Sequence, residues 1–230
     1  MTPLSGAADQ AGISTPALRS PQRGPKRSLA DALADPRVRL GAGAAALLVT
    51  AIAAHRDHVG QCEAAAFRAV NGLPRSFYPP AWTVMQLGTL GAAPAAAGVA
   101  WLAGDRELAG RLLAGGAGTW ALSKVFKQMV RRPRPAALVS GVRTRGRDAS
   151  GLGYLSGHAG VAVALGASAF PHLGKTGRAV TLSVAPVVGL TRIYVGAHLP
   201  LDVAGGAALG FVVEAAATLG RRPAAARRRR

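Results

Sequence analysis

The chain has 230 residues, half of them hydrophobic, and carries a formal net charge of +18. Its mean hydropathy is +0.23, and because soluble domains rarely combine a positive value with so much charge, the composition favours a membrane domain with basic ends. The single cysteine, Cys62, excludes an intrachain disulfide and a cysteine metal cluster, and the scarcity of aromatic residues argues against nucleic acid as a partner.

The two ends of the chain differ in composition from its centre. Residues 1–36 are rich in Pro, Ser, Gly and Arg and lack apolar periodicity, so we expect a disordered basic tail there. The last ten residues, 221–230, read RRPAAARRRR and form a second basic tail. Residues 37–220 are then expected to form one membrane domain.

Six apolar segments follow the first tail, at residues 38–54, 81–103, 108–126, 156–170, 179–196 and 201–219. Each is near the length that crosses about 30 Å of hydrocarbon, although the first and the fourth are short. Ala and Gly fill much of them, which makes close helix packing easy. A soluble Ala-rich bundle is the alternative, but several runs carry no charged face for water. The predicted fold is therefore an all-α polytopic membrane protein, with six transmembrane helices in a bundle and an active site at one membrane face.

Between the first two segments, residues 61–80 read QCEAAAFRAVNGLPRSFYPP. This stretch either forms a short amphipathic helix on the outer surface or simply connects the two segments.

An even number of spans places both basic tails on one side, which the positive-inside rule identifies as the cytoplasm. Abundant Ala, Gly and Arg are typical of a GC-rich bacterial genome. Together with the six segments, this composition leads us to expect a multi-pass protein of the bacterial cell membrane with both termini in the cytoplasm. The stretch from Lys124 to Arg147 would lie outside, yet it holds eight basic residues. This conflict is resolved if some of those cations bind an anion at an active site that faces outward.

Three stretches carry ionisable residues at segment ends. The first, KQMVRRPRP, supplies Lys127 and Arg134 after the third segment, where two prolines stiffen the chain. Taken alone, such a juxtamembrane basic cluster more often attracts lipid headgroups and nothing more. The second, YLSGHAG, places Ser156, Gly157 and His158 at the start of the fourth segment, where free N–H groups suit a phosphate. Taken alone, Ser-Gly-His is more often a helix cap than a catalytic group.

The third stretch, TRIYVGAHLPLD, joins the fifth and sixth segments. His198 and Asp202 are four residues apart, so on one helical face the carboxylate can accept a hydrogen bond from one imidazole nitrogen and leave the other as a nucleophile. Arg192 is close enough to hold the anion under attack. The alternative is an interfacial ion pair between Arg192 and Asp202. The six-span topology places all three stretches at one membrane face.

Together the three stretches resemble the signature of the type 2 phosphatidic acid phosphatase (PAP2) family, which is related to the vanadium haloperoxidases: K-x6-RP, PSGH and SR-x5-H-x3-D. Arg132 does not fit the first element, because Val125 stands where the lysine would be. Leu155 replaces the family proline, and Thr191 replaces the family serine while keeping a hydroxyl. The residues that match are Lys127, Arg134, Pro135, Ser156, Gly157, His158, Arg192, His198 and Asp202.

The resemblance implies a two-step phosphatase that needs neither metal nor cofactor. Lys127, Arg134 and Arg192, with Ser156 and the backbone N–H of Gly157, would hold the phosphoryl oxygens. Neutral His198, oriented by Asp202, would attack phosphorus to give a phosphohistidine. His158 would then protonate the leaving group and activate water.

A reacting centre at the membrane surface favours a phosphorylated lipid as the substrate: phosphatidic acid, phosphatidylglycerol phosphate or a polyprenyl diphosphate. The bilayer and this lipid are the expected partners, and no obligate protein partner is inferred. One alternative is a phosphotransferase, in which an acceptor other than water takes the phosphate. Another is a non-catalytic protein that binds anionic lipid, although binding alone needs neither His198 nor Asp202. A transporter is less favoured, because no internal repeat is evident.

Overall fold

The computed structural model describes residues 35–56, 58–146 and 150–220. Within these ranges the chain is helical and has no strand, as the all-α prediction requires. The predicted tails lie outside the described residues, apart from Asp35 and Pro36. The α-helices are α2 (Pro36–Ala54), α3 (Gln61–Asn71), α4 (Tyr78–Met85), α5 (Ala92–Leu102), α6 (Arg106–Val130), α7 (Pro135–Leu138), α8 (Gly157–Ala169), α9 (Lys175–Tyr194) and α10 (Pro200–Leu219), and the 3-10 turns are η1 (Arg75–Phe77), η2 (Gln86–Gly88) and η3 (Phe170–His172).

Five of the six predicted segments are single helices, but the second is divided. Residues 81–103 run through the end of α4, the turn η2 and then α5, so the expectation of one continuous helix there is wrong. A Cβ atom on Gly88 would lie 2.5 Å from the carbonyl oxygen of His158. The absence of a side chain at Gly88 therefore lets the η2 backbone approach the first turn of α8.

The described helices have features of a membrane domain. Two of them, α2 and α10, are long and apolar enough to cross a membrane by length and composition. Large apolar side chains also point outward: Val49 on α2 is 65% exposed, Met129 on α6 is 66% exposed and Leu102 at the end of α5 is 87% exposed. Such a surface suits lipid better than water. These observations indicate a membrane location, whereas the number of spans stays a prediction.

Helix α8 lies inside the bundle, between α6, α9 and α10. Glycines on α10 allow this approach, because Cβ atoms on Gly206 and Gly210 would lie 2.2 Å and 2.4 Å from the carbonyl oxygens of Ser156 and Gly160. The close packing expected from the Ala- and Gly-rich segments is thus present, and it fixes the start of α8 against the start of α10.

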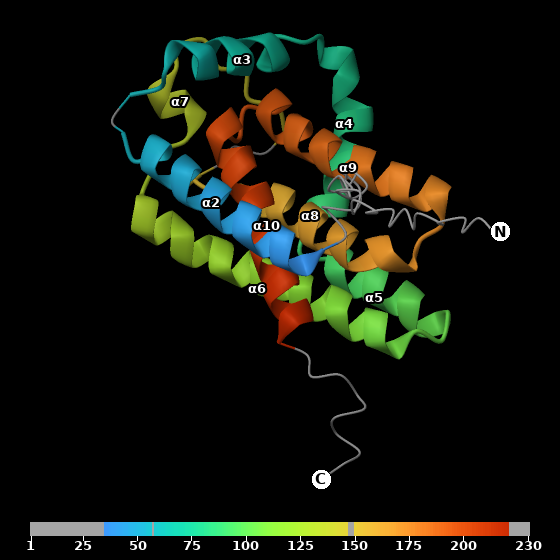
Figure 1. The fold of residues 1–230 in the computed structure, drawn as a ribbon. Coiled ribbons are helices and arrows are strands. Elements are labelled where there is room, and N and C mark those ends of the chain that lie inside the picture. The colour runs from blue at the N-terminus through green and yellow to red at the C-terminus, as the bar shows by residue number, and fades with distance from the viewer. Residues whose placement is uncertain (1–34, 57, 147–149, 221–230) are drawn as a thin grey trace, which may run out of the picture.

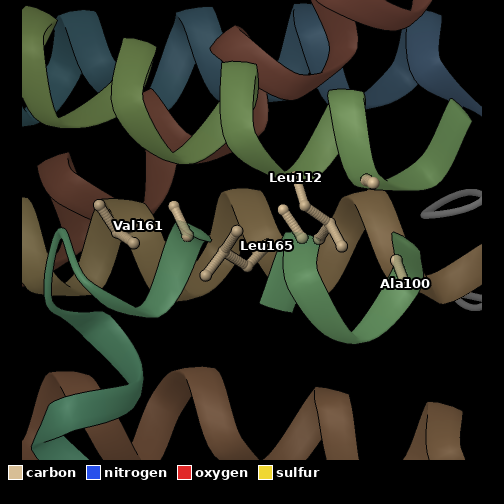
Figure 2. Close-up of a cluster of buried hydrophobic side chains, with 7 residues drawn as sticks. Ala100, Leu112, Val161 and Leu165 are labelled. Atoms are coloured by element: carbon tan, nitrogen blue, oxygen red, sulfur yellow. The ribbon is translucent and has the colours of Figure 1, made fainter. Parts of the chain in front are cut away.

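A cluster of small apolar side chains joins α5, α6 and α8 (Figure 2). Leu112 of α6 and Val161 and Leu165 of α8 interlock with alanines of α5, of which Ala100 is labelled. This packing holds α5 to the bundle after the break at η2.

Helix α3 lies across one end of the bundle, beside α7 (Figure 1). The amphipathic helix that was one of two expectations for residues 61–80 is therefore present as α3, and it buries Ala64, Phe67 and Asn71. Phe67 packs with Ile193 at the end of α9 and with Leu199 at the start of α10. Helix α3 thus covers the end of the bundle that contains the turn between α9 and α10.

Further along α10, a buried ion cluster ties this helix to α2 and α6. Glu214 is 2% exposed and lies 2.7 Å from Nη2 of Arg39 and 3.0 Å from Nη2 of Arg111. Glu214 is twelve residues beyond Asp202, about 18 Å along the helix axis.

Candidate active site

The turn from α9 to α10 places His198 directly before the last helix. The backbone N–H groups of Ala197 and His198 both donate to the carbonyl of Arg192, at 3.1 Å and 3.2 Å. Gly196 has φ +78°, a left-handed conformation that favours glycine. Pro200 then starts α10 in the position where proline suits a helix best.

His198 and Asp202 face each other across this turn. Nδ1 of His198 lies 3.6 Å from Oδ2 of Asp202, slightly beyond hydrogen-bond range, and Nδ1 has no hydrogen-bond partner in the described part of the chain. Oδ2 accepts the backbone N–H of Leu199 at 2.8 Å. A contraction of a few tenths of an ångström would close the His198–Asp202 hydrogen bond, which is a common tightening when a ligand binds.

The other imidazole nitrogen faces a cation. Nη1 of Arg134 lies 3.2 Å from Nε2 of His198 and donates to the carbonyl of Ala197 at 2.6 Å. Because a guanidinium only donates, this contact requires the lone pair on Nε2 and the proton on Nδ1. Burial, and then the charges of Lys127, Arg134 and Arg192, hold the pKa of His198 well below its usual value. The imidazole is therefore neutral at pH 7 and presents Nε2 as the nucleophilic atom.

Arg134 and Arg192 are under-satisfied for buried guanidinium groups. Nε of each is buried without a hydrogen-bond partner among the described residues. Nη1 of Arg192 contacts the sulfur of Met85 at 2.6 Å, and a thioether is a weak acceptor. Unmet donors on two neighbouring cations suit an anion with several oxygens.

Lys127 has a different environment from these two arginines. Its ammonium group donates to the carbonyls of Leu152, Gly153 and Leu155, at 3.1 Å, 3.0 Å and 2.7 Å. Three contacts match its three protons, so in this structure Lys127 braces the loop before α8 and adds its charge to the site. Its predicted direct contact with phosphate stays a prediction.

The SGH stretch forms the first turn of α8. Ser156 is buried, and its hydroxyl accepts the N–H of Ala159 at 3.5 Å, as a helix cap does. Its own N–H donates to the carbonyl of Asp202 at 2.8 Å, which joins this turn to α10. Gly157 packs against Ser123, whose hydroxyl would lie 3.1 Å from a Cβ atom there.

His158 is half-buried at the same helix start. It interacts electrostatically with Arg192, Arg134 and Lys127, and also with His198. The structure therefore brings all eight predicted site residues to one place, with Ser156 and Lys127 engaged in protein contacts.

The structure shows the surroundings of Leu155 and Thr191, the two residues that differ from the family pattern. Leu155 is fully buried in an apolar cluster, and its carbonyl accepts from Lys127. The hydroxyl of Thr191 donates to the carbonyl of Val188 at 2.7 Å, so its proton is directed at its own helix.

The sequence analysis missed two residues that contact the site. Nη1 of Arg132 donates to Oδ1 of Asp202 at 3.0 Å and to Oε1 of Glu63 at 3.0 Å, while its Nη2 donates to Oε2 of Glu63 at 2.6 Å. The motif spacing had excluded Arg132 from the phosphate-binding set. The sequence did contain a signal that could have drawn attention to Glu63, because it is the only acidic residue between residues 58 and 104.

Comparisons with known proteins place this geometry in context. The sequence model of the PAP2 superfamily matches residues 108–224, just over half of the chain. A transmembrane PAP2-type phosphatidylglycerolphosphate phosphatase from Bacillus subtilis is similar in structure, with a TM-score of 0.63, 20% identity, and coverage of 80% of this chain and 98% of that one. LpxE of Aquifex aeolicus is similar with a TM-score of 0.61, 22% identity, and coverage of 68% of this chain and 93% of that one. No curated protein sequence matches the chain.

Proposed function

The chain belongs to the PAP2 superfamily, and from this premise we propose that it is a membrane lipid phosphatase that acts through a phosphohistidine at His198. The observation that carries the proposal is the arrangement around this imidazole. Nδ1 points to Asp202 at 3.6 Å, and Nε2 lies 3.2 Å from a guanidinium with an unmet donor. A nucleophile and an anion-binding group are thus adjacent.

In the first step, the lone pair on Nε2 of His198 forms a bond to phosphorus. The bond from phosphorus to the lipid oxygen breaks, its electron pair leaves with that oxygen, and His158 supplies the proton. In the second step, water attacks phosphorus and gives its proton to His158. The N–P bond breaks, its electrons return to Nε2, and inorganic phosphate leaves.

The cations stabilise the charge that develops on the phosphoryl oxygens. Arg134 and Arg192 supply forked donors, and Lys127 supplies a nearby positive charge. Backbone N–H groups in the first turn of α8, including that of Gly157, are the further donors, in a turn that Ser156 caps. We propose that this set makes a metal ion unnecessary.

A lipid substrate is supported by an apolar cavity of about 810 Å³ between α5, α8 and α9. Its lining includes Gln86 and Leu87, which follow Met85 in the chain. Met85 is the residue whose sulfur contacts Arg192. A lipid tail in this cavity would leave its phosphate next to Arg192, in a site that we propose faces the outside of the cell.

The first experiment measures phosphate release by the purified protein in detergent with a chelator present. Phosphatidic acid, phosphatidylglycerol phosphate and polyprenyl diphosphate are compared, with His198→Ala as the test variant. His55→Ala is the matched control, because His55 is an exposed residue at the end of α2. We expect chelator-resistant release that His198→Ala abolishes and His55→Ala keeps.

Labelled substrate identifies the intermediate. With ³²P in the transferred group, an acid-labile label should appear on the wild-type protein and not on His198→Ala. Release that a chelator abolishes would contradict the metal-free mechanism. Label that persists on His198→Ala would contradict the phosphohistidine assignment, and label that turns over only with an added alcohol would identify a phosphotransferase.

A further inference from the structure

Glu63 lies on α3, outside the residues that match the PAP2 superfamily. Its carboxylate is nevertheless bound within the proposed site. Oε1 accepts the backbone N–H of Leu201 at 3.0 Å, in the first turn of α10. Both oxygens also accept from Arg132, at 3.0 Å and 2.6 Å. One side chain of α3 therefore holds both the start of α10 and an arginine of the loop after α6.

Arg132 continues this chain of contacts to Asp202. Arg132 is 3% exposed and Asp202 is fully buried, and the two meet at 3.0 Å. A buried carboxylate needs such a partner to remain charged. The cation that holds Asp202 is thus Arg132, a residue for which the motif gives no role.

The shared use of Arg132 decides which oxygen of Asp202 remains available. A guanidinium that binds one carboxylate prefers a bidentate arrangement, in which it donates to both oxygens of that carboxylate. Here both terminal nitrogens of Arg132 donate to Glu63. Asp202 therefore accepts from Arg132 through a single hydrogen bond, from Nη1 to Oδ1. Oδ2 is left to the N–H of Leu199 and to the imidazole of His198.

We propose that Glu63 and Arg132 are positioning residues, which keep Oδ2 of Asp202 directed at His198. Glu63 acts by occupying Arg132 and by fixing the first turn of α10. The catalytic consequence rests on the proposed role of His198 as the nucleophile. The positional consequence, a defined orientation and tautomer of His198, does not depend on any substrate.

The test compares Glu63→Gln with a matched buried glutamate. Glu214→Gln also removes a carboxylate that holds two arginines, but far along α10 from Asp202. We expect Glu63→Gln to lower kcat for phosphate release about tenfold or more with KM within about twofold. We expect Glu214→Gln to leave kcat unchanged in the folded fraction. Glu63→Asp, which keeps the charge but shortens the reach, serves if Glu63→Gln does not fold.

A double-variant comparison separates positioning from a general loss of stability. If Glu63 acts through Asp202, then kcat of Glu63→Gln combined with Asp202→Asn equals that of Asp202→Asn alone. Effects that multiply in the double variant would overturn the proposal, because they would show that Glu63 acts by another route.

NMR of ¹⁵N-histidine-labelled protein supplies a readout that needs no activity. The His198 signals are assigned by their loss in His198→Asn. Wild type should show a protonated Nδ1 and a bare Nε2, and Glu63→Gln should shift this pattern while Glu214→Gln does not. If no lipid is hydrolysed but the pattern shifts, the proposed function fails and the positioning role stands. If lipid is hydrolysed but Glu63→Gln changes neither kcat nor the pattern, the positioning role is wrong.

Discussion

The guanidinium of Arg134 lies 3.2 Å from Nε2 of His198, the atom that we propose attacks phosphorus. A proton on that nitrogen would place two cations against each other without an acceptor between them. The guanidinium that we propose as a ligand of the phosphoryl group therefore also keeps the proposed nucleophile deprotonated.

The first prediction concerns the pH dependence of kcat/KM. Burial and neighbouring cations lower the pKa of His198, so attack by neutral His198 should be lost only as pH falls through a value well below the usual 6.5. The same cations surround His158, so its protonated form depends on the negative charge of the bound phosphate. Loss of that proton should therefore produce an alkaline limb in kcat, which reports the enzyme–substrate complex. Profiles of kcat/KM and kcat from pH 4 to 10 check both limbs. An acid limb at 6.5 or above, or no alkaline limb in kcat, would contradict the paired roles of the two histidines.

The same pKa has a consequence for stability. Since the folded protein binds fewer protons at His198 than the unfolded chain, its stability should be greatest above about pH 6.5 and should fall as pH drops from there toward the lowered pKa. Thermal unfolding of wild type and His198→Asn at pH 7.5 and pH 5 measures this. The wild-type protein should lose more stability than the variant between the two values, and an equal loss would show that His198 does not contribute.

Arg192→Lys tests a guanidinium whose one hydrogen-bond partner among the described residues is the sulfur of Met85. The substitution keeps the charge but removes the fork, so we expect kcat/KM to fall about tenfold to a hundredfold, from the loss of one or two charge-assisted hydrogen bonds. The melting temperature should barely change, because the thioether contact is weak. Steady-state kinetics and thermal unfolding check both parts, and a large fall in melting temperature with normal kinetics would assign Arg192 a structural role.

Lys127→Met should affect stability as well as activity, in contrast to Arg192→Lys. It leaves the carbonyls of Leu152, Gly153 and Leu155 without their donor. An unsatisfied, partly buried polar group costs about 1–3 kcal/mol. We therefore expect a lower melting temperature in detergent, measured by dye-free fluorescence. An unchanged melting temperature with lost activity would instead favour direct contact between Lys127 and phosphate.

Gly206→Ala tests the approach of α8 to α10. The new Cβ atom would lie 2.2 Å from the carbonyl of Ser156, so the helices must separate, at a cost of about 1–3 kcal/mol. Activity should fall with stability, because the first turn of α8 and Asp202 lie on opposite sides of this contact. Gly98→Ala on α5 is the control, since no atom of the described residues beyond its own helical turns lies within 4 Å of a Cβ atom there. Equal behaviour of the two variants would show that the close approach does not matter.

Much of the site could be predicted because its residues lie close together along the chain. His198 and Asp202 are four residues apart at a helix start, and Ser156 precedes Gly157 at another, so local helix geometry determines how each pair meets. The helical segments followed from their apolar composition in the same way. The division of residues 81–103 did not, because the backbone of Gly88 meets that of His158, a residue of another segment, and no pattern within residues 81–103 indicates that contact.

Contacts between distant segments were decided by the tertiary structure alone. Glu63 and Arg132 are 69 residues apart, and no spacing rule relates a residue on α3 to one after α6. Lys127 matches the motif by position, yet the fold of the loop before α8 determines that its ammonium faces three carbonyls. The sequence by itself thus determined which side chains are candidates for the proposed chemistry, because short-range geometry depends on neighbouring residues. Which partners hold those side chains was settled only by the packing of helices that are far apart in the chain.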